Sequence, residues 1–170
     1  MRTLTIAAAA AATLLAGCAK PGPPPKPQPG SWSMKMELVD AQGPDADKVK
    51  AMMGPMFASM SNMSICITPE ASAKSDPTKG ITQGGDCKFD RQEVNSSGIH
   101  VSGVCTKNGT QSKVTADGSI TATSQDLTMQ TETTPPGGKA PMSMKLRMQM
   151  QRTGDCKPGD ITPPAGSGPM

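Results

Sequence analysis

The stretch that decides the fold reads Met142-Ser143-Met144-Lys145-Leu146-Arg147-Met148-Gln149-Met150-Gln151-Arg152. Apolar and polar residues alternate without a break from Met142 to Gln151, and this period of two is typical of a β-strand with one buried face. Its antiparallel partner is predicted at 126–134, because the intervening loop at 135–138 reads Pro-Pro-Gly-Gly, a strong turn signal. The end of the chain therefore predicts antiparallel β-structure.

The same alternation occurs further towards the N-terminus, beginning at Trp32. Strands are predicted at 32–38, 63–67, 86–94, 98–106, 111–116 and 119–124. A turn signal at 95–98 separates the third and fourth of these strands. Asp117-Gly118, a common two-residue hairpin sequence, is expected to join the last two. Together with a polar, glycine-rich loop at 71–85, these segments predict a meander of antiparallel strands.

One segment has a helical period instead. Its apolar residues recur with the spacing of one helix face: Val49, Met52, Met53, Met56, Phe57 and Met60. Gly54-Pro55 interrupts the segment, because proline lacks the amide donor that an inner helical turn needs. At about 45–62 we therefore expect one kinked amphipathic helix, or two short pieces, packed on the sheet. The fold class predicted is α+β, mainly antiparallel β.

The N-terminus has the form of an export signal. Arg2 precedes an apolar run from Ile6 to Leu15, which is too short to span a membrane. Leu15-Ala16-Gly17-Cys18 resembles the lipobox of bacterial lipoproteins, in which the cysteine is acylated and the signal is cut before it. We predict a signal peptide at 1–17 and a lipidated Cys18. The alternative is an ordinary signal peptide with a chance cysteine at the cut.

The segments that follow Cys18 predict an anchored domain. Residues 18–30 are rich in proline and are interpreted as an extended tether between the lipid and a domain at 31–156. A disordered tail is expected at 157–170. Neither Ala19 nor Lys20 is aspartate, and by analogy with lipoprotein sorting this indicates the outer membrane, facing the periplasm. The expected partner of the N-terminus is thus the membrane.

The remaining cysteines are even in number, as an oxidising compartment favours. Cys66, Cys87, Cys105 and Cys156 allow three pairings. In a hairpin centred on Ser96, Cys87 lies opposite Cys105 and Phe89 opposite Gly103, which favours a Cys87–Cys105 bond. Cys66–Cys156 then remains as the second. A zinc site is the rival interpretation, but its usual close C-x-x-C pairs are not present.

Composition excludes some classes of function. Without its signal peptide the chain has 153 residues and a formal net charge of +2. It has three aromatic residues and no basic cluster, so nucleic-acid binding is not expected. His100 is the only histidine, and no nucleophile elbow, phosphate-binding loop or His-Glu-x-x-His motif occurs. We therefore expect a non-enzymatic module without a cofactor.

The fourteen methionines suggest two alternatives. Thioethers suit Cu(I), and Met52, Met53, Met56 and Met60 share one helix face. A methionine-lined helix over a curved sheet would also suit an apolar ligand such as a lipid. The simpler interpretation is that methionine fills the core in place of leucine. The ligand or envelope partner stays open.

Several short motifs resemble those of the domain-of-unknown-function family numbered 3617, small exported proteins of proteobacteria. They are Pro29-Gly30-Ser31-Trp32, Cys66-Ile67-Thr68-Pro69-Glu70, Cys87, Cys105 and Arg152-Thr153-Gly154-Asp155-Cys156. The match covers about 29–157, essentially the whole folded part. The resemblance implies an envelope location and a shared disulfide framework, and it implies no activity.

Overall fold

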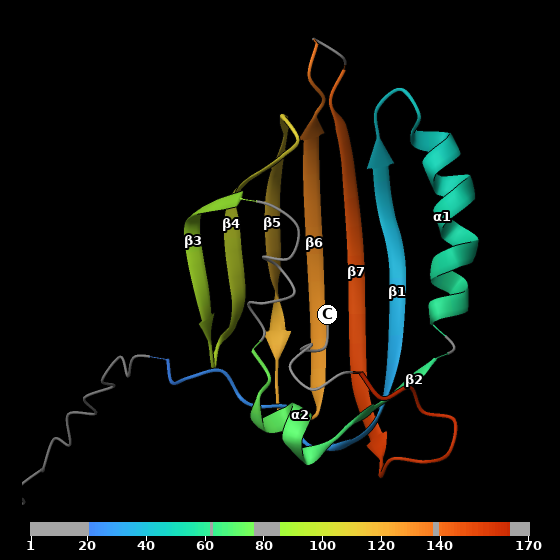
Figure 1. Cartoon of the computed structure of the whole chain (residues 1–170), viewed down its shortest axis with the longest axis vertical. Helices are drawn as coiled ribbons and strands as arrows, with labels where there is room; N and C mark the ends of the chain where they lie inside the picture. Colours follow the sequence, from blue (N-terminus) through green and yellow to red (C-terminus); the bar gives the residue numbers. More distant parts are fainter. Residues whose placement is uncertain (1–20, 62, 77–85, 138–139, 164–170) are drawn as a thin grey trace, which may run out of the picture.

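A computed structural model describes residues 21–61, 63–76, 86–137 and 140–163 (Figure 1). Within these ranges the chain forms one seven-stranded sheet and two helices. The predicted signal peptide at 1–17 and Cys18 lie outside the described residues. None of the helices in the described part has the length and apolarity that a membrane crossing would need.

The sheet is antiparallel throughout, which confirms the predicted fold class. In chain order the elements are β1 (Gly30–Gln42), α1 (Ala46–Met60), β2 (Ser64–Ile67), α2 (Pro69–Ala73), β3 (Asp86–Asn95), β4 (Gly98–Lys107), β5 (Thr110–Ile120), β6 (Ser124–Thr134) and β7 (Met142–Gly154). The spatial order is β2-β1-β7-β6-β5-β4-β3. Strands β3 to β7 form the expected meander, and β1 pairs with β7 to extend it.

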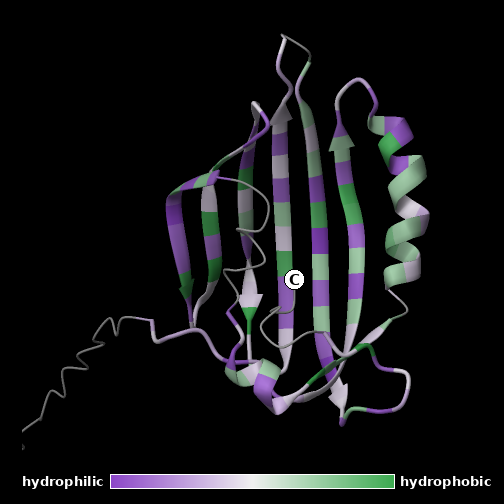
Figure 2. Cartoon of the chain, in the orientation of Figure 1, coloured by the Kyte–Doolittle hydropathy of each residue, from purple (hydrophilic) through white to green (hydrophobic). Residues whose placement is uncertain are grey.

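The core lies on the apolar face of this sheet. Met34 of β1 lies opposite Met150 of β7, which in turn lies opposite Gln125 of β6. The bands of alternating hydropathy along β1, β6 and β7 show this pattern (Figure 2). The buried cluster consists of Trp32, Met34, Ile67, Ile99, Val101, Ala116, Ile120, Leu127, Met148 and Met150. Methionine therefore supplies three of these ten core residues, all from β1 and β7.

The predicted turn at Asp117-Gly118 is wrong, because β5 runs through both residues. Gly118 is a position of close approach inside the strand: a Cβ there would lie 2.0 Å from the carbonyl oxygen of Asp126. The β5–β6 turn forms instead at Thr121–Ser124, where the Thr121 hydroxyl accepts the amide of Ser124 at 2.8 Å.

Helix α1 is a single helix that continues through Pro55. It lies beside β1 at the edge of the sheet rather than across its face (Figure 1). Strand β2 pairs only with Gly30–Ser33, and α1 flanks the rest of that edge, where the Met36 amide donates to the Ser61 hydroxyl at 3.0 Å. The helix predicted to pack on the sheet therefore packs along its edge strand, β1, with Phe57 buried between them.

Two further predictions need correction. The loop predicted at 71–85 begins inside a short helix, α2. This helix starts at Pro69, which fits the first helical position, and the Thr68 hydroxyl caps it by accepting the Ala71 amide at 3.1 Å. Residues 77–85 lie outside the described part. The tail is ordered at its start, since Ile161 forms a parallel bridge with Ile65; residues 164–170 are not described.

Candidate functional site

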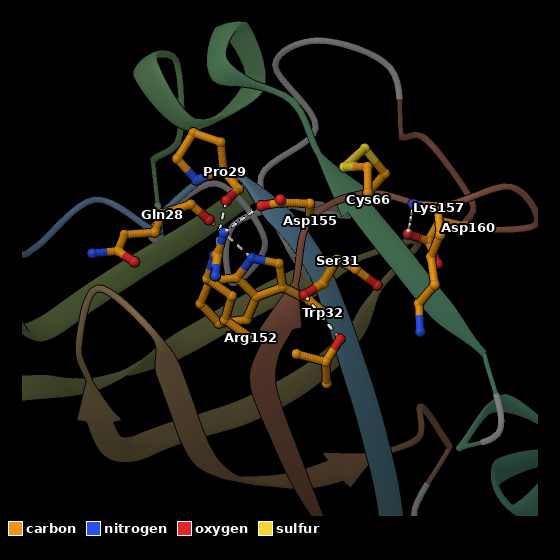
Figure 3. Close-up of polar contacts among 11 residues, drawn as sticks. Gln28, Pro29, Ser31, Trp32, Cys66, Arg152, Asp155, Lys157 and Asp160 are labelled. Carbon is orange, nitrogen blue, oxygen red and sulfur yellow. Dashed lines mark hydrogen bonds and ion pairs between the residues drawn. A yellow bond between two sulfur atoms is a disulfide. The ribbon is translucent and has the colours of Figure 1, made fainter.

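The three longer motifs of the sequence meet at one end of the sheet. Ser31 at the start of β1 lies opposite Cys66 of β2 on one side and Gly154 of β7 on the other. The next residue, Trp32, lies opposite Arg152. We call this region, formed by the start of β1, β2, the end of β7 and residues 155–161, the strand-end junction. It is drawn in Figure 3.

Arg152 is the central charged residue of the junction. Its Nε donates to the carbonyl oxygen of Pro29 at 2.9 Å, and its Nη2 lies 3.3 Å from a carboxylate oxygen of Asp155 (Figure 3). The Asp155 side chain is fully exposed, so this ion pair contributes little. The bond to the backbone therefore matters more, because it fixes the chain just before β1.

Gly30 makes this arrangement possible. Its φ is +140°, a conformation that residues with a side chain rarely adopt. A Cβ at this position would lie 2.2 Å from the carbonyl oxygen of Gly154 and 2.9 Å from the Arg152 guanidinium. Glycine at position 30 therefore leaves the space that the Arg152 guanidinium occupies beside the backbone.

The junction is also cross-linked. A disulfide joins Cys66 to Cys156, 90 residues apart, which confirms one predicted pairing. The following residues return to β2: the Cys66 amide donates to the Ile161 carbonyl at 2.8 Å, and the Ile161 amide donates to the Ser64 carbonyl at 2.9 Å. The chain beyond the last cysteine thus adds a short strand contact to the edge of β2.

Asp160 holds this return segment in place. Its carboxylate accepts a hydrogen bond from the Ser64 hydroxyl and another from the Lys157 amide, the latter at 2.9 Å. Both bonds favour the charged form and lower the pKa of Asp160, the Ser64 bond most. Asp160 lies outside every predicted strand, so the sequence gave no signal of this role.

The proline-rich segment is part of the junction, which corrects its interpretation as a plain tether over the described residues. Pro27 is buried, and its carbonyl accepts the Ser72 hydroxyl of α2 at 2.5 Å. The Gln28 amide donates to the carbonyl of Ala122 at 2.7 Å, and the Gln28 carbonyl accepts the Trp32 indole N–H at 3.0 Å. We call residues 22–30 the strap, because they run along the end of the sheet.

The second predicted disulfide, Cys87–Cys105, is also present. Its hairpin is not centred on Ser96, however, because Asn95 pairs with Gly98 and the turn centre falls between Ser96 and Ser97. Without a correction Cys87 would face Thr106. A β-bulge between Phe89 and Arg91 shifts the register by one residue, which places Cys87 opposite Cys105 and Phe89 opposite Gly103, as predicted.

The four methionines proposed for Cu(I) differ in exposure. Met52 is 68% exposed and Met56 46%, whereas Met53 and Met60 are half-buried. Phe57 is the buried residue of α1, so the helix turns its stripe partly away from the sheet. The strand methionines behave differently, since Met148 and Met150 belong to the core and Met142 and Met144 are half-buried.

The polar face of the sheet carries cross-strand charge pairs. His100 Nδ1 lies 2.9 Å from Asp117, and His100 is opposite Glu93 on its other side. Arg147 binds Asp126 through Nε at 2.9 Å and Nη2 at 2.6 Å, and this guanidinium lowers the pKa of Asp126. In the described part of the chain, no group of three or more His, Cys, Asp or Glu side chains is placed to hold a metal ion.

Sequence reasoning missed Arg152 and the strap. A signal for Arg152 existed: the period of two that buries Met148 and Met150 also puts Arg152 on the apolar face, where a charge needs a fixed partner. The strap carried no such signal, because its partners are α2 and the β5–β6 turn, which the sequence did not place, and the β3–β4 turn, which is 74 residues away in the sequence.

The comparisons with known proteins give a family without an assigned activity. The model of a family described as a protein of unknown function, DUF3617, matches residues 27–156. A search of curated proteins and a search of solved structures found no match. The matched range begins in the strap and ends at the cysteine that closes the junction. The chain therefore belongs to the DUF3617 family of proteins of unknown function.

Proposed function

We propose that the protein is a lipid-anchored protein of the bacterial cell envelope whose folded part is a non-enzymatic binding or structural module. The observation that carries this proposal is the use of the cysteines. Four of the five form disulfides, which fits an oxidising compartment, and Cys18 in the lipobox-like stretch is the one left over. Acylation gives that thiol a role.

The anchor is tested by intact mass and fractionation of the full chain expressed in a bacterial host. We expect a protein that lacks residues 1–17 and carries acyl chains on Cys18, in the membrane fraction. Cys18→Ala is expected to leave a precursor of full length without lipid. An unmodified Cys18 on an exported chain would contradict the proposal.

The outer membrane is the proposed destination, and Ala19 tests it. Replacing it as Ala19→Asp is expected to move the lipidated protein into the inner-membrane fraction, because aspartate after the lipidated cysteine retains lipoproteins there. Ala19→Ser is the matched control and should leave the distribution unchanged. An Ala19→Asp protein that stays with the outer membrane would remove this part of the proposal.

A second candidate function is Cu(I) binding, which the exposure of Met52 and Met56 favours over simple core filling. These thioethers lie one helical turn apart and are open to solvent. Titration with Cu(I) compares the wild type with Met52→Leu/Met56→Leu and with Met144→Leu as a control on the strand. Equal affinities in all three proteins, or no binding, would exclude this function.

An apolar ligand is the remaining alternative. A hollow of about 590 Å³ between α1 and β1 is lined by apolar residues, among them Met36, Leu38 and Phe57, and by the charged residues Lys35, Glu37 and Lys50. A bound lipid would be detected by native mass spectrometry of the protein extracted in mild detergent. A mass that corresponds to the protein alone would count against this alternative.

A further inference from the structure

The strap is held to the sheet from its first residue. The Gly22 amide donates to the Ser96 hydroxyl at 3.0 Å, and the Ser96 amide donates to the Gly22 carbonyl at 2.9 Å. This reciprocal pair binds the strap to the β3–β4 turn. Further along, Lys26 Nζ donates to the carbonyl of Ala73 at 2.5 Å, which binds the strap to α2.

The contacts of the strap lie at one end of the sheet. The β3–β4 turn, the β5–β6 turn and α2 are all at the lower end in Figure 1, beside residues 21–30. We call these three elements together the strap end. The β4–β5 turn at 108–109 and the β6–β7 loop lie at the other end. A strand of ten or eleven residues separates the two ends, a distance of about 35 Å.

The chain leaves little distance between the strap and Cys18. Three residues, 19–21, separate Cys18 from Gly22. Four Cα–Cα steps reach at most about 14 Å when fully extended. A free proline-rich tether from Cys18 to Gly30 would instead span about 37 Å. The bound strap therefore shortens the reach between the lipid and the domain by more than half.

We propose that the strap end faces the membrane directly and that lipid headgroups are the partner of this surface. The proposal rests on the lipidation of Cys18. A short link to one corner of an elongated domain fixes which end lies at the bilayer, and the opposite end then points away from it.

The composition of the strap end suits headgroups rather than the hydrocarbon core. Its turns expose hydroxyl groups at Ser96, Ser97 and Thr123, Lys26 is exposed beside them, and the exposed Glu70 of α2 is neutralised by its ion pair with Lys74. Among the described residues, four of the five exposed large apolar side chains, Val39, Met52, Met56 and Val104, lie away from this end of the sheet, and the fifth, Ile161, lies in the strand-end junction beside β2. Hydroxyl and ammonium groups are donors for lipid phosphates, whereas insertion would need apolar residues.

Energy transfer to the membrane surface tests this orientation. Ser97 and Pro136, each replaced separately by p-azidophenylalanine and coupled to a donor dye, report on the two ends of the sheet. The lipidated protein is placed in phosphatidylethanolamine–phosphatidylglycerol vesicles with an acceptor dye on the headgroups. We expect transfer from position 97 to be at least twice that from position 136. Equal transfer from both positions would overturn the proposal.

A longer link provides the matched control. Twelve Gly/Ser residues inserted between Lys20 and Pro21 leave the strap intact but release the domain from the bilayer. Transfer from position 97 is then expected to fall towards the value at position 136, with an unchanged circular dichroism spectrum. Unchanged transfer would show that the short link does not set the orientation, and would overturn the proposal.

Failure of the anchor is distinguished from failure of the orientation in the same samples. Intact mass reports whether Cys18 is acylated, independently of energy transfer. If it is not, coupling of the Cys18 thiol to a maleimide phospholipid supplies the anchor chemically. The difference between positions 97 and 136 then still decides the orientation.

Discussion

The two disulfides stabilise two very different regions. Cys66–Cys156 lies in the strand-end junction, next to the buried residues Trp32 and Ile67, and closes a loop across most of the fold. Cys87–Cys105 joins two residues that lie opposite each other on β3 and β4, at the far edge of the sheet and beside a hollow of about 600 Å³. The first bond unites segments that are distant in sequence, whereas the second reinforces a pairing that is already local.

The difference shows how a thin core is supplemented. At the junction, the disulfide, the Arg152 bond and the strap all hold segments that no hairpin connects. At the β3–β4 edge, the strands are adjacent in sequence, and the bulge and the charges at Lys88, Asp90 and Arg91 protect an edge strand from pairing with other chains. Long-range ties are concentrated where the first and last strands of the sheet, β1 and β7, lie side by side.

Removal of each disulfide is the strongest test of this comparison. Loop-closure entropy predicts a loss of about 4.5 kcal/mol for Cys66→Ala/Cys156→Ala and roughly 3 kcal/mol for Cys87→Ala/Cys105→Ala. The first variant is therefore expected to be largely unfolded, whereas the second stays folded with a lower midpoint. Chemical denaturation monitored by Trp32 fluorescence measures both. If the Cys66→Ala/Cys156→Ala protein were the more stable of the two variants, the comparison would be reversed.

The close approach at Gly30 is tested next. Gly30→Ala places a methyl group against the Gly154 backbone at an unfavourable φ, and we expect a loss of about 3 kcal/mol. Gly137→Ala is the control, because Gly137 also has a positive φ, +81°, but no atom lies within 4 Å of its added Cβ. Thermal unfolding of both proteins separates the clash from the cost of the conformation. Equal losses would show that the contact with Gly154 has no effect.

A smaller effect is expected from Arg152. Arg152→Met keeps much of the side-chain bulk but removes the donor to the Pro29 carbonyl, at a cost of about 1–2 kcal/mol. Arg91→Met removes an exposed ion pair with Glu93 at the other edge and should change stability far less, because solvent screens this pair. Urea denaturation compares the two. Similar small losses would mean that Arg152 acts only as a surface charge.

The weakest expected effect is the pH dependence of the return segment. The pKa of Asp160 is lowered in the folded protein, so its bonds to Ser64 and Lys157 stabilise the fold above the ordinary aspartate pKa. This contribution is lost as the pH falls below about 4 and passes through the lowered pKa. The protection of the Ile161 amide, its exchange rate relative to that of an unstructured peptide at the same pH, should fall there in the wild type. Asp160→Asn should lose this pH dependence, whereas the exposed Asp155→Asn should retain it.

The sequence predicted those parts of the fold that depend on local pattern. The alternation at 142–152 identified β7, and symmetry about the β3–β4 turn identified Cys87–Cys105. This second prediction succeeded for an incomplete reason, because the assumed centre at Ser96 was offset by half a residue and the bulge near Asp90 compensated for it. The turn at Asp117-Gly118 failed because Gly118 is needed for close strand packing.

The candidate site could be predicted only in part. The predicted Cys66–Cys156 pairing brought the motifs around Cys66 and Arg152 together, but nothing local indicated that Trp32 lies between them. Their meeting depends on β1 pairing with both β2 and β7, a long-range arrangement that periodicity does not encode. The strap was misinterpreted for a related reason: proline-rich composition describes a free chain well, and it contains no information on the carbonyl groups that bind it.

Hydrogen exchange at the Gln28 amide tests the central claim most directly, namely that the proline-rich segment belongs to the fold. This amide donates to the Ala122 carbonyl at 2.7 Å. Nuclear magnetic resonance of the chain without its signal peptide is expected to show the Gln28 amide protected to nearly the same degree as the amides of β1. The reason is that both become accessible to exchange only when the strand-end junction unfolds. Exchange of Gln28 at the rate of an unstructured peptide, with β1 still protected, would contradict the account.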